Sequence, residues 1–124
     1  MTTAFWCVLM AALLPYLGTV VAKVGGQSYN NRDPRAWLEK QQGFRRRADH
    51  AQQNGFEAFP FFAAAVIVAQ LAHAPQARID VVAITFILAR FAYFVCYLAD
   101  WHWVRSLVWM VGFGSCVAIF LLAA

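Results

Sequence analysis

Polar side chains recur along one stretch of the chain at a spacing that would bring them together on a helix. Arg47, His50, Asn54 and Glu57 stand at positions i, i+3, i+7 and i+10, so an α-helix presents all four on one face. The same stretch continues directly into a long apolar run. A carboxylate this deep in a hydrophobic helix is costly without a partner. The pattern therefore predicts a polar site that binds a ligand or pairs with another helix.

A second polar pattern lies in the third apolar run, where Arg90, Tyr93 and Tyr97 share a helix face at i, i+3 and i+7. An arginine in the middle of a membrane span indicates a functional site or a structural ion pair, and the two interpretations are compatible. Glu57 and Arg90 each lie about 15 Å from the ends of their helices that face the same side, at about 1.5 Å per residue. We therefore predict that Glu57 and Arg90 are level and can pair, within or between subunits.

The elements that must hold these residues are long and apolar. Hydrophobic residues make up 62% of the 124-residue chain and charged residues 13%, which is typical of a membrane protein. Four unbroken apolar runs approach the ~20 residues that a helix needs to cross a bilayer, and such runs favour helices over barrel strands. We expect an all-α integral membrane protein, a four-transmembrane-helix up-down bundle in one domain at residues 1–124, with helices at about 3–24, 45–74, 76–99 and 104–122.

The charges predict the orientation of this bundle. Most of the lysines and arginines lie between the first two spans, whereas the loop between the second and third spans holds only Arg78. By the positive-inside rule, the loop at about 25–44 is cytoplasmic and both termini lie outside. Because this topology accounts for the net charge of +4, no binding of nucleic acid is expected.

The loop at 25–44 has helix signals of its own. Asp33 and Pro34 are typical of a helix start, and Gly43 is typical of a helix end. Trp37 and Phe44 stand among charges and suit an anchor at the level of the lipid headgroups. A flexible loop with one aromatic residue is the alternative.

The cysteines and histidines predict neither a disulfide framework nor a metal site. Cys7, Cys96 and Cys116 all lie within expected spans, so we interpret them as small apolar residues. Neither His50 nor His102 has a second His, Cys or carboxylate at ligand spacing.

The fourth apolar run opens with Arg105 and Ser106 near its cytoplasmic end. Arg105 is a further inside-positive charge, a site residue, or both. Trp109 and the tryptophans before this run are typical of an aromatic belt. Small residues farther along would let another helix pack closely: Gly112, Gly114, Ser115 and Ala118.

Taken together, these motifs resemble those of the MAPEG proteins, the membrane-associated proteins in eicosanoid and glutathione metabolism. The resemblance rests on N-x-x-E-x-F-P-x-F at Asn54–Phe62, preceded by Arg47, and on A-R-x-x-Y-x-x-x-Y at Ala89–Tyr97, followed by Arg105 and Ser106. It extends over essentially the whole chain. The segment NNRDPRAWL is similar to that of bacterial members, which implies an integral protein of a bacterial inner membrane.

The resemblance implies a homotrimer in contact with membrane lipids. Glutathione would bind between neighbouring subunits near the cytoplasmic face, and a lipophilic substrate would enter from the bilayer. Two positions depart from the family pattern: His50 stands where many active members carry an arginine, and Gln53 stands where the residue is sometimes basic. Transferred residue by residue, Arg105 would be catalytic, and the glutathione-binding set would be Arg47, His50, Asn54, Glu57, Arg90, Tyr93 and Tyr97.

These residue types fit the chemistry of glutathione, which carries two carboxylates, an ammonium and a thiol. Arginines bind carboxylates in bidentate fashion, and Glu57 could bind the ammonium. A guanidinium beside the thiol favours the reactive thiolate. Lowering the pKa of a thiol by about two corresponds to about 2.7 kcal/mol, which Arg105 could supply in a low-dielectric site. Tyr93 or Ser106 could assist with a hydroxyl group.

We therefore expect a glutathione-dependent transferase or peroxidase that acts on a lipophilic electrophile. The alternative is a non-enzymatic lipid-binding or helper protein on the same scaffold. His50, which replaces an expected arginine, gives this alternative more weight but does not place it first. A channel or transporter is disfavoured, since one polar cluster near a single membrane face offers no continuous polar path.

Overall fold

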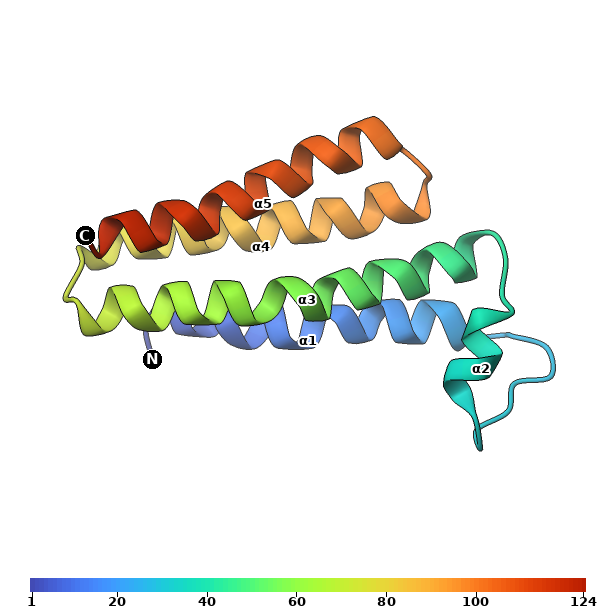
Figure 1. Ribbon diagram of the computed structural model, residues 1–124. Helices are drawn as coiled ribbons and strands as arrows, with labels where there is room; N and C mark the ends of the chain where they lie inside the picture. The colour runs from blue at the N-terminus through green and yellow to red at the C-terminus, as the bar shows by residue number, and fades with distance from the viewer.

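The computed structural model describes residues 1–124 as five α-helices without a strand (Figure 1). A short helix, α2 (Pro34–Glu39), lies in the connection between the first two long ones. The expected fold class, all-α with four membrane-crossing helices, is confirmed. The four helices that are long and apolar enough to cross a membrane are α1 (Thr3–Lys23), α3 (Phe44–Leu71), α4 (Gln76–Leu98) and α5 (His102–Leu122).

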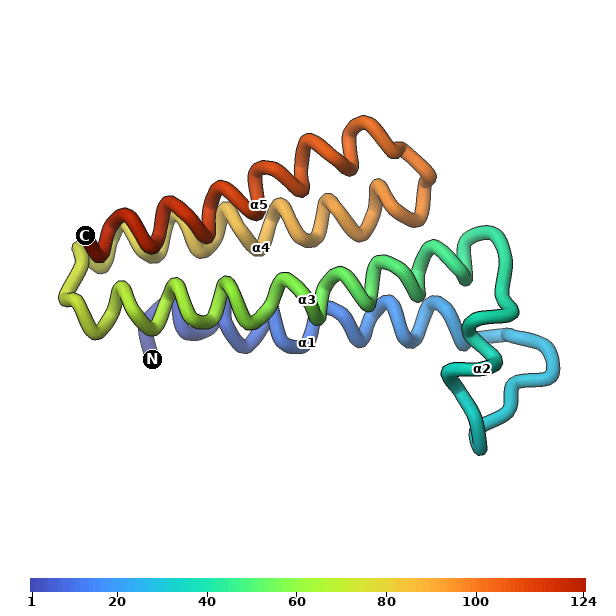
Figure 2. Tube along the Cα trace, in the orientation of Figure 1, coloured from blue at the N-terminus to red at the C-terminus, as the bar shows by residue number.

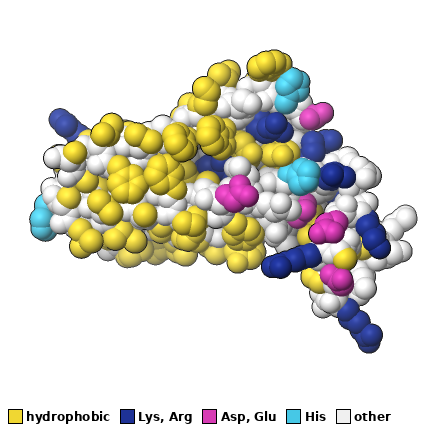
Figure 3. Space-filling view, in the orientation of Figure 1, with side chains coloured by type: hydrophobic (Ala, Val, Ile, Leu, Met, Phe, Trp, Pro, Cys, Tyr) yellow, Lys and Arg dark blue, Asp and Glu magenta, His cyan; other side chains and the backbone are white.

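The long helices form two antiparallel pairs, α1 with α3 and α4 with α5. The pairs lie close together where α3 turns into α4, and they diverge toward the end that carries α2 (Figures 1 and 2). Charged side chains gather at the α2 end, whereas hydrophobic side chains cover most of the remaining surface on the face shown (Figure 3). We call the α2 end of the bundle the charged end.

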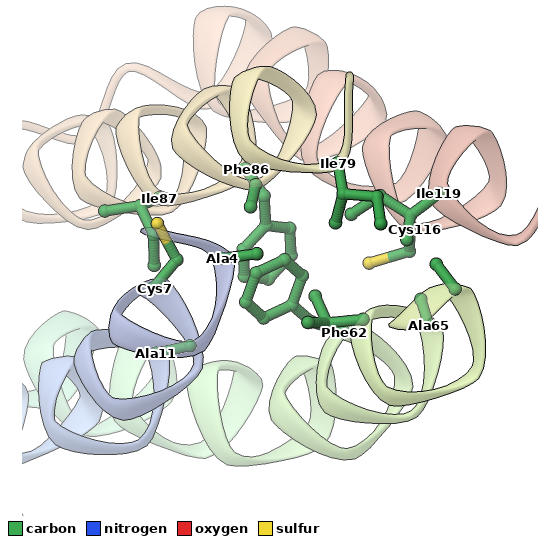
Figure 4. Close-up of a cluster of buried hydrophobic side chains, with 13 residues drawn as sticks. Ala4, Cys7, Ala11, Phe62, Ala65, Ile79, Phe86, Ile87, Cys116 and Ile119 are labelled. Carbon is green, nitrogen blue, oxygen red and sulfur yellow. The ribbon is translucent and has the colours of Figure 1, made fainter. Parts of the chain in front are cut away.

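A core of small and aromatic side chains joins the two pairs. Phe62 of α3 stacks on Phe86 of α4, with ring centroids 3.9 Å apart and ring planes 5° from parallel (Figure 4). The buried residues that α1 contributes to this core are all small, namely Ala4, Cys7 and Ala11, so the α1 backbone can approach its neighbours closely. The cysteines are buried and free, as expected for small apolar residues.

Glycines hold α1 and α3 close to one another. A Cβ added to Gly55 would lie 2.8 Å from Cγ of Pro15, and one added to Gly18 would lie 2.8 Å from the Ala48 carbonyl oxygen. Both distances are shorter than van der Waals contact, so a larger residue would force the helices apart. The close approach fixes the rotation of α3 and therefore the direction of its polar face.

The second long helix ends at Leu71 rather than at the expected residue 74. His73 adopts a left-handed conformation with a φ of 55°, and the Ala74 N–H donates to the Ala69 carbonyl at 3.0 Å. A left-handed residue of this kind closes a helix. The chain then turns through Pro75 into α4.

Near this turn Asp80 connects three helices. Its carboxylate accepts one hydrogen bond from the Ala4 N–H at 2.8 Å and another from Gln76 Nε2 at 2.7 Å, and Gln76 accepts one from Gln70 at 2.6 Å. A carboxylate at a helix N-terminus satisfies a free N–H and interacts favourably with the helix dipole. Nothing in the sequence pattern pointed to this role.

The short helix α2 begins where the sequence predicts. Asp33 accepts a hydrogen bond from the Ala36 N–H at 3.2 Å, and Pro34 is the first helical residue. The helix ends at Glu39, earlier than expected from Gly43. Gly43 instead precedes α3, with a positive φ of 63° that suits glycine.

Trp37, which we expected to anchor at the lipid headgroups, is buried instead. Only 7% of its surface is exposed, it packs with Leu38 and Ala48, and its Nε1 donates to the Gln27 carbonyl at 3.1 Å. The expectation was wrong because the loop gives the indole both an acceptor and an apolar contact at the ends of α1 and α3. Phe44, the other expected anchor, is 48% exposed.

Candidate functional site

A buried arginine connects the two helix pairs. Arg90 of α4 is 7% exposed, and its Nη2 donates to Asn54 Oδ1 of α3 at 2.8 Å. A buried guanidinium needs such an acceptor, because an unpaired charge is costly in a low-dielectric interior. Two of the predicted site residues therefore meet, although 36 positions separate them in the sequence.

Glu57 lies beside this pair. A cavity of about 230 Å³ is lined by Asn54, Glu57 and Arg90 among others, so the acid and the guanidinium are level, as their depths predicted. Within the chain, however, the guanidinium donates to Asn54 rather than to Glu57, and Glu57 is exposed. A neutral amide satisfies Arg90 without burying a second charge. The Glu57 carboxylate is therefore available to another group.

An arginine guanidinium lies over the ring of each of two tyrosines in α4. Cζ of Arg90 lies 4.3 Å from the ring centroid of Tyr93, and Cζ of Arg105 lies 4.4 Å from that of Tyr97. The two rings meet edge to face, with centroids 5.5 Å apart. Both guanidinium distances are within the range of cation–π attraction. We call these four residues the arginine–tyrosine cluster.

A second cavity opens beside Arg105. Its volume is about 370 Å³, and it shares two lining residues, Asn54 and Trp109, with the first cavity. The predicted catalytic arginine and the two residues with the candidate hydroxyl groups therefore border one space, although the Ser106 hydroxyl donates to the His102 carbonyl at 3.1 Å. The lining residues are Asn54, Tyr93, Arg105, Ser106, Trp109 and Met110.

The first cavity becomes apolar away from the charged end. Phe61, Phe86, Phe113 and Cys116 contribute to its lining. Phe113 stacks on Trp109 with centroids 5.2 Å apart and lies 5.5 Å from Phe61. One cavity thus has a charged edge and an aromatic wall, a combination typical of sites for small organic ligands.

Arg47 and His50, two further predicted site residues, line neither cavity. Arg47 donates from Nε and Nη2 to the Leu98 carbonyl at 3.3 and 3.1 Å, so it caps the C-terminal end of α4. The ring of His50 lies 6.3 Å from that of Tyr97. His50 therefore lies beside the outer end of the arginine–tyrosine cluster, and Arg47 binds the residue that follows Tyr97.

Two contributors to the site went unrecognised in the sequence. Trp109, interpreted as part of an aromatic belt, lines both cavities. Gly112 lines the first cavity, and a Cβ added there would lie 3.6 Å from Cδ of Arg90. Both follow Arg105 along α5, at i+4 and i+7, so helical spacing alone could have placed them on its face.

The donor set suits an organic zwitterion better than a metal ion. The polar groups of the two linings are guanidinium, amide and hydroxyl groups, and Glu57 is the one carboxylate. No group of three His, Cys, Asp or Glu side chains comes together anywhere in the chain. Arginines can bind carboxylates, Glu57 can bind an ammonium, and the aromatic wall can bind an apolar group.

The sequence matches a family model over nearly its whole length. The family is described as the MAPEG family, and the matched region is residues 3–124. No curated protein and no solved structure matches the chain. The matched region includes every residue that lines the two cavities.

Proposed function

The chain belongs to the MAPEG family, and from this membership we propose that it is a glutathione-dependent membrane transferase or peroxidase acting on a lipophilic electrophile. The observation that carries the proposal is the pair of adjoining cavities. Arg105 borders one, an aromatic wall borders the other, and Asn54 and Trp109 line both. A thiol tripeptide and an apolar acceptor could occupy neighbouring spaces with their reacting atoms adjacent, which is a large part of what catalysis requires.

The charged groups support glutathione as the polar ligand. Arg90 uses one N–H group on Asn54, which leaves others free for a carboxylate of the tripeptide. Glu57 is level with Arg90 and has no hydrogen-bond partner of its own in the subunit, so it is the proposed acceptor for the ammonium. Tyr93, which lines the second cavity, provides a hydroxyl near the thiol.

Arg105 is the proposed catalytic residue, because its positive charge would stabilise the glutathione thiolate. In a transfer reaction the sulfur donates an electron pair to form the new C–S bond, and the leaving group departs with the electron pair of the broken bond. With a hydroperoxide, the sulfur attacks oxygen, the O–O bond breaks and an alcohol leaves. A second glutathione then reduces the resulting sulfenic acid, which yields glutathione disulfide and water.

We also propose the assembly and orientation that family membership implies. Glu57 and Trp109 are exposed at the surface of an isolated subunit, so a neighbouring subunit of a homotrimer could cover both cavities. The concentration of lysine and arginine at the charged end supports a cytoplasmic position for the 25–44 loop, with both termini outside. A bacterial inner membrane is the proposed location, where the lipophilic substrate would arrive from the lipid.

The proposal is tested by glutathione binding and turnover of the purified protein in detergent. We expect calorimetry to detect glutathione binding and an absorbance assay to detect conjugation of a chlorodinitrobenzene. Arg105→Ala should still bind glutathione but lower kcat by about 100-fold. Arg78→Ala, which removes a charge at the opposite end of the bundle, is the matched control and should keep full activity. Normal turnover by Arg105→Ala would remove the role assigned to that residue.

A second candidate function, a non-enzymatic lipid-binding or helper protein on the same scaffold, is favoured by the positions of Arg47 and His50. Two N–H groups of Arg47 donate to the Leu98 carbonyl, and His50 stands where an arginine is expected. Fewer cationic side chains are therefore free to bind a tripeptide. Calorimetry that detects no glutathione binding, together with a lipid that copurifies with the protein, would support this candidate and overturn the enzyme proposal.

A further inference from the structure

Arg105 is held by an aromatic ring rather than by an acid. Its Cζ lies 4.4 Å from the ring centroid of Tyr97, and its guanidinium forms no hydrogen bond or ion pair within the subunit. A carboxylate partner would occupy N–H groups and neutralise the charge. A ring does neither, because it attracts the cation through its electron-rich face. This arrangement preserves both the charge and the donors that an approaching thiolate needs.

We infer that Tyr97 is the positioning residue for Arg105, and that the ring of Tyr97, not its hydroxyl, holds the guanidinium beside the thiol. The inference rests on the proposed function, because it assigns Tyr97 an effect on glutathione chemistry. A cation–π contact stabilises the arrangement in which the cation lies over the ring by about two- to fivefold at an exposed site and by about thirtyfold at a desolvated one. Arg105 is half-buried, so an effect of about tenfold is expected.

The ring is itself held from two sides. Tyr93, which is buried, meets it edge to face at 5.5 Å, and His50 approaches it at 6.3 Å. Arg47 binds the carbonyl of Leu98, the residue after Tyr97, at 3.1 Å. These contacts fix the last turn of α4, and so Arg47 and His50 contribute to the site by orienting the ring that orients Arg105.

The hydroxyl of Tyr97 forms no hydrogen bond in the subunit, which separates the ring from the hydroxyl experimentally. Tyr97→Phe keeps the ring face and removes the hydroxyl, whereas Tyr97→Leu removes the ring. The readouts are kcat and KM for conjugation and, without turnover, the ultraviolet absorbance of the thiolate of bound glutathione as a function of pH. Thermal unfolding checks that each variant folds, and Tyr97→Met replaces the leucine variant if that variant does not.

We expect Tyr97→Phe, which keeps the ring face, to lose clearly less kcat than Tyr97→Leu. Tyr97→Leu should lower kcat by about tenfold and should raise the pKa of the bound thiol by about one. Equal losses in both variants would assign the effect to the hydroxyl and overturn the inference. An unchanged kcat and thiol titration in Tyr97→Leu would also overturn it while leaving the proposed function intact. A wild-type protein without glutathione binding or turnover would reject the proposed function and this inference together.

Discussion

Arg90 Nη2 donates to Asn54 Oδ1 at 2.8 Å and so joins α4 to α3 inside the bundle. Asn54 also lines both cavities. One amide therefore satisfies a buried charge and borders the two spaces proposed for the reactants. The stability of the fold and the proposed glutathione binding should therefore be coupled at this residue.

Replacing Asn54 with leucine should therefore affect both properties. Asn54→Leu keeps the approximate volume but leaves the Arg90 guanidinium without its acceptor, at a cost of about 2 kcal/mol in the free energy of unfolding. Glutathione affinity should fall by about tenfold, because the guanidinium is no longer held in place. Denaturant unfolding followed by circular dichroism and calorimetry measure the two effects. Asn31→Leu, in the exposed loop, is the control, and equal stability of the two variants would contradict the expected role.

Glu57→Gln should weaken glutathione binding without weakening the fold. Glu57 is exposed and has no hydrogen-bond partner in the subunit, so its charge contributes little to stability. Loss of an ion pair with the ligand ammonium should lower affinity by about tenfold or more. A glutathione analogue without the amino group provides a double-mutant cycle. Wild-type protein and Glu57→Gln should bind the analogue equally well; a similar loss of affinity for both ligands would mean that Glu57 does not contact the ammonium.

Much of the fold follows from the sequence because lipid imposes strict rules on the chain. Four long apolar runs must form helices that satisfy their own backbone hydrogen bonds, and all four appear near the expected positions. Trp37 was misplaced because its burial depends on the Gln27 carbonyl, which no helical periodicity reveals. The Asp80 contact with the Ala4 N–H was missed for the same reason, since it joins residues 76 positions apart.

Helical spacing in the sequence predicted which site residues share a face of one helix, but not the contacts between helices. The spacing along α4 predicted that Arg90, Tyr93 and Tyr97 lie together. The depth of Glu57 in its helix predicted that it is level with Arg90. Spacing does not determine which side chain on a neighbouring helix a donor reaches. Arg90 donates to Asn54 rather than to Glu57. Which of the two side chains faces Arg90 depends on the rotation of α3 against α1.

Asp80→Ala should reduce stability without reducing catalysis. The variant removes the acceptor at the N-terminus of α1, which should cost about 1 kcal/mol in the free energy of unfolding. Asp80 lines neither cavity, so kcat and glutathione affinity should stay within about twofold of the wild-type values. Asp80→Asn keeps an acceptor oxygen and should lose less stability than the alanine variant. A large fall in glutathione affinity with unchanged stability would show that Asp80 acts on the site.

Gly112→Leu should distinguish binding of the apolar substrate from binding of glutathione. A Cβ at this position has ordinary van der Waals distances, 3.6 Å to Cδ of Arg90 and 3.9 Å to Cβ of Ala89, so Gly112→Ala should fold normally. A leucine side chain would extend into the 230 Å³ cavity and should raise KM for an aryl electrophile by about tenfold. Glutathione affinity should fall by less than this, because the leucine lies on the side of the aromatic wall, although Arg90 lines the same cavity. Gly114→Leu is the matched control, because a Cβ there has no neighbour within 4 Å. Kinetics with each substrate varied in turn measure both constants. Equal KM values in the two leucine variants would mean that the apolar substrate binds elsewhere.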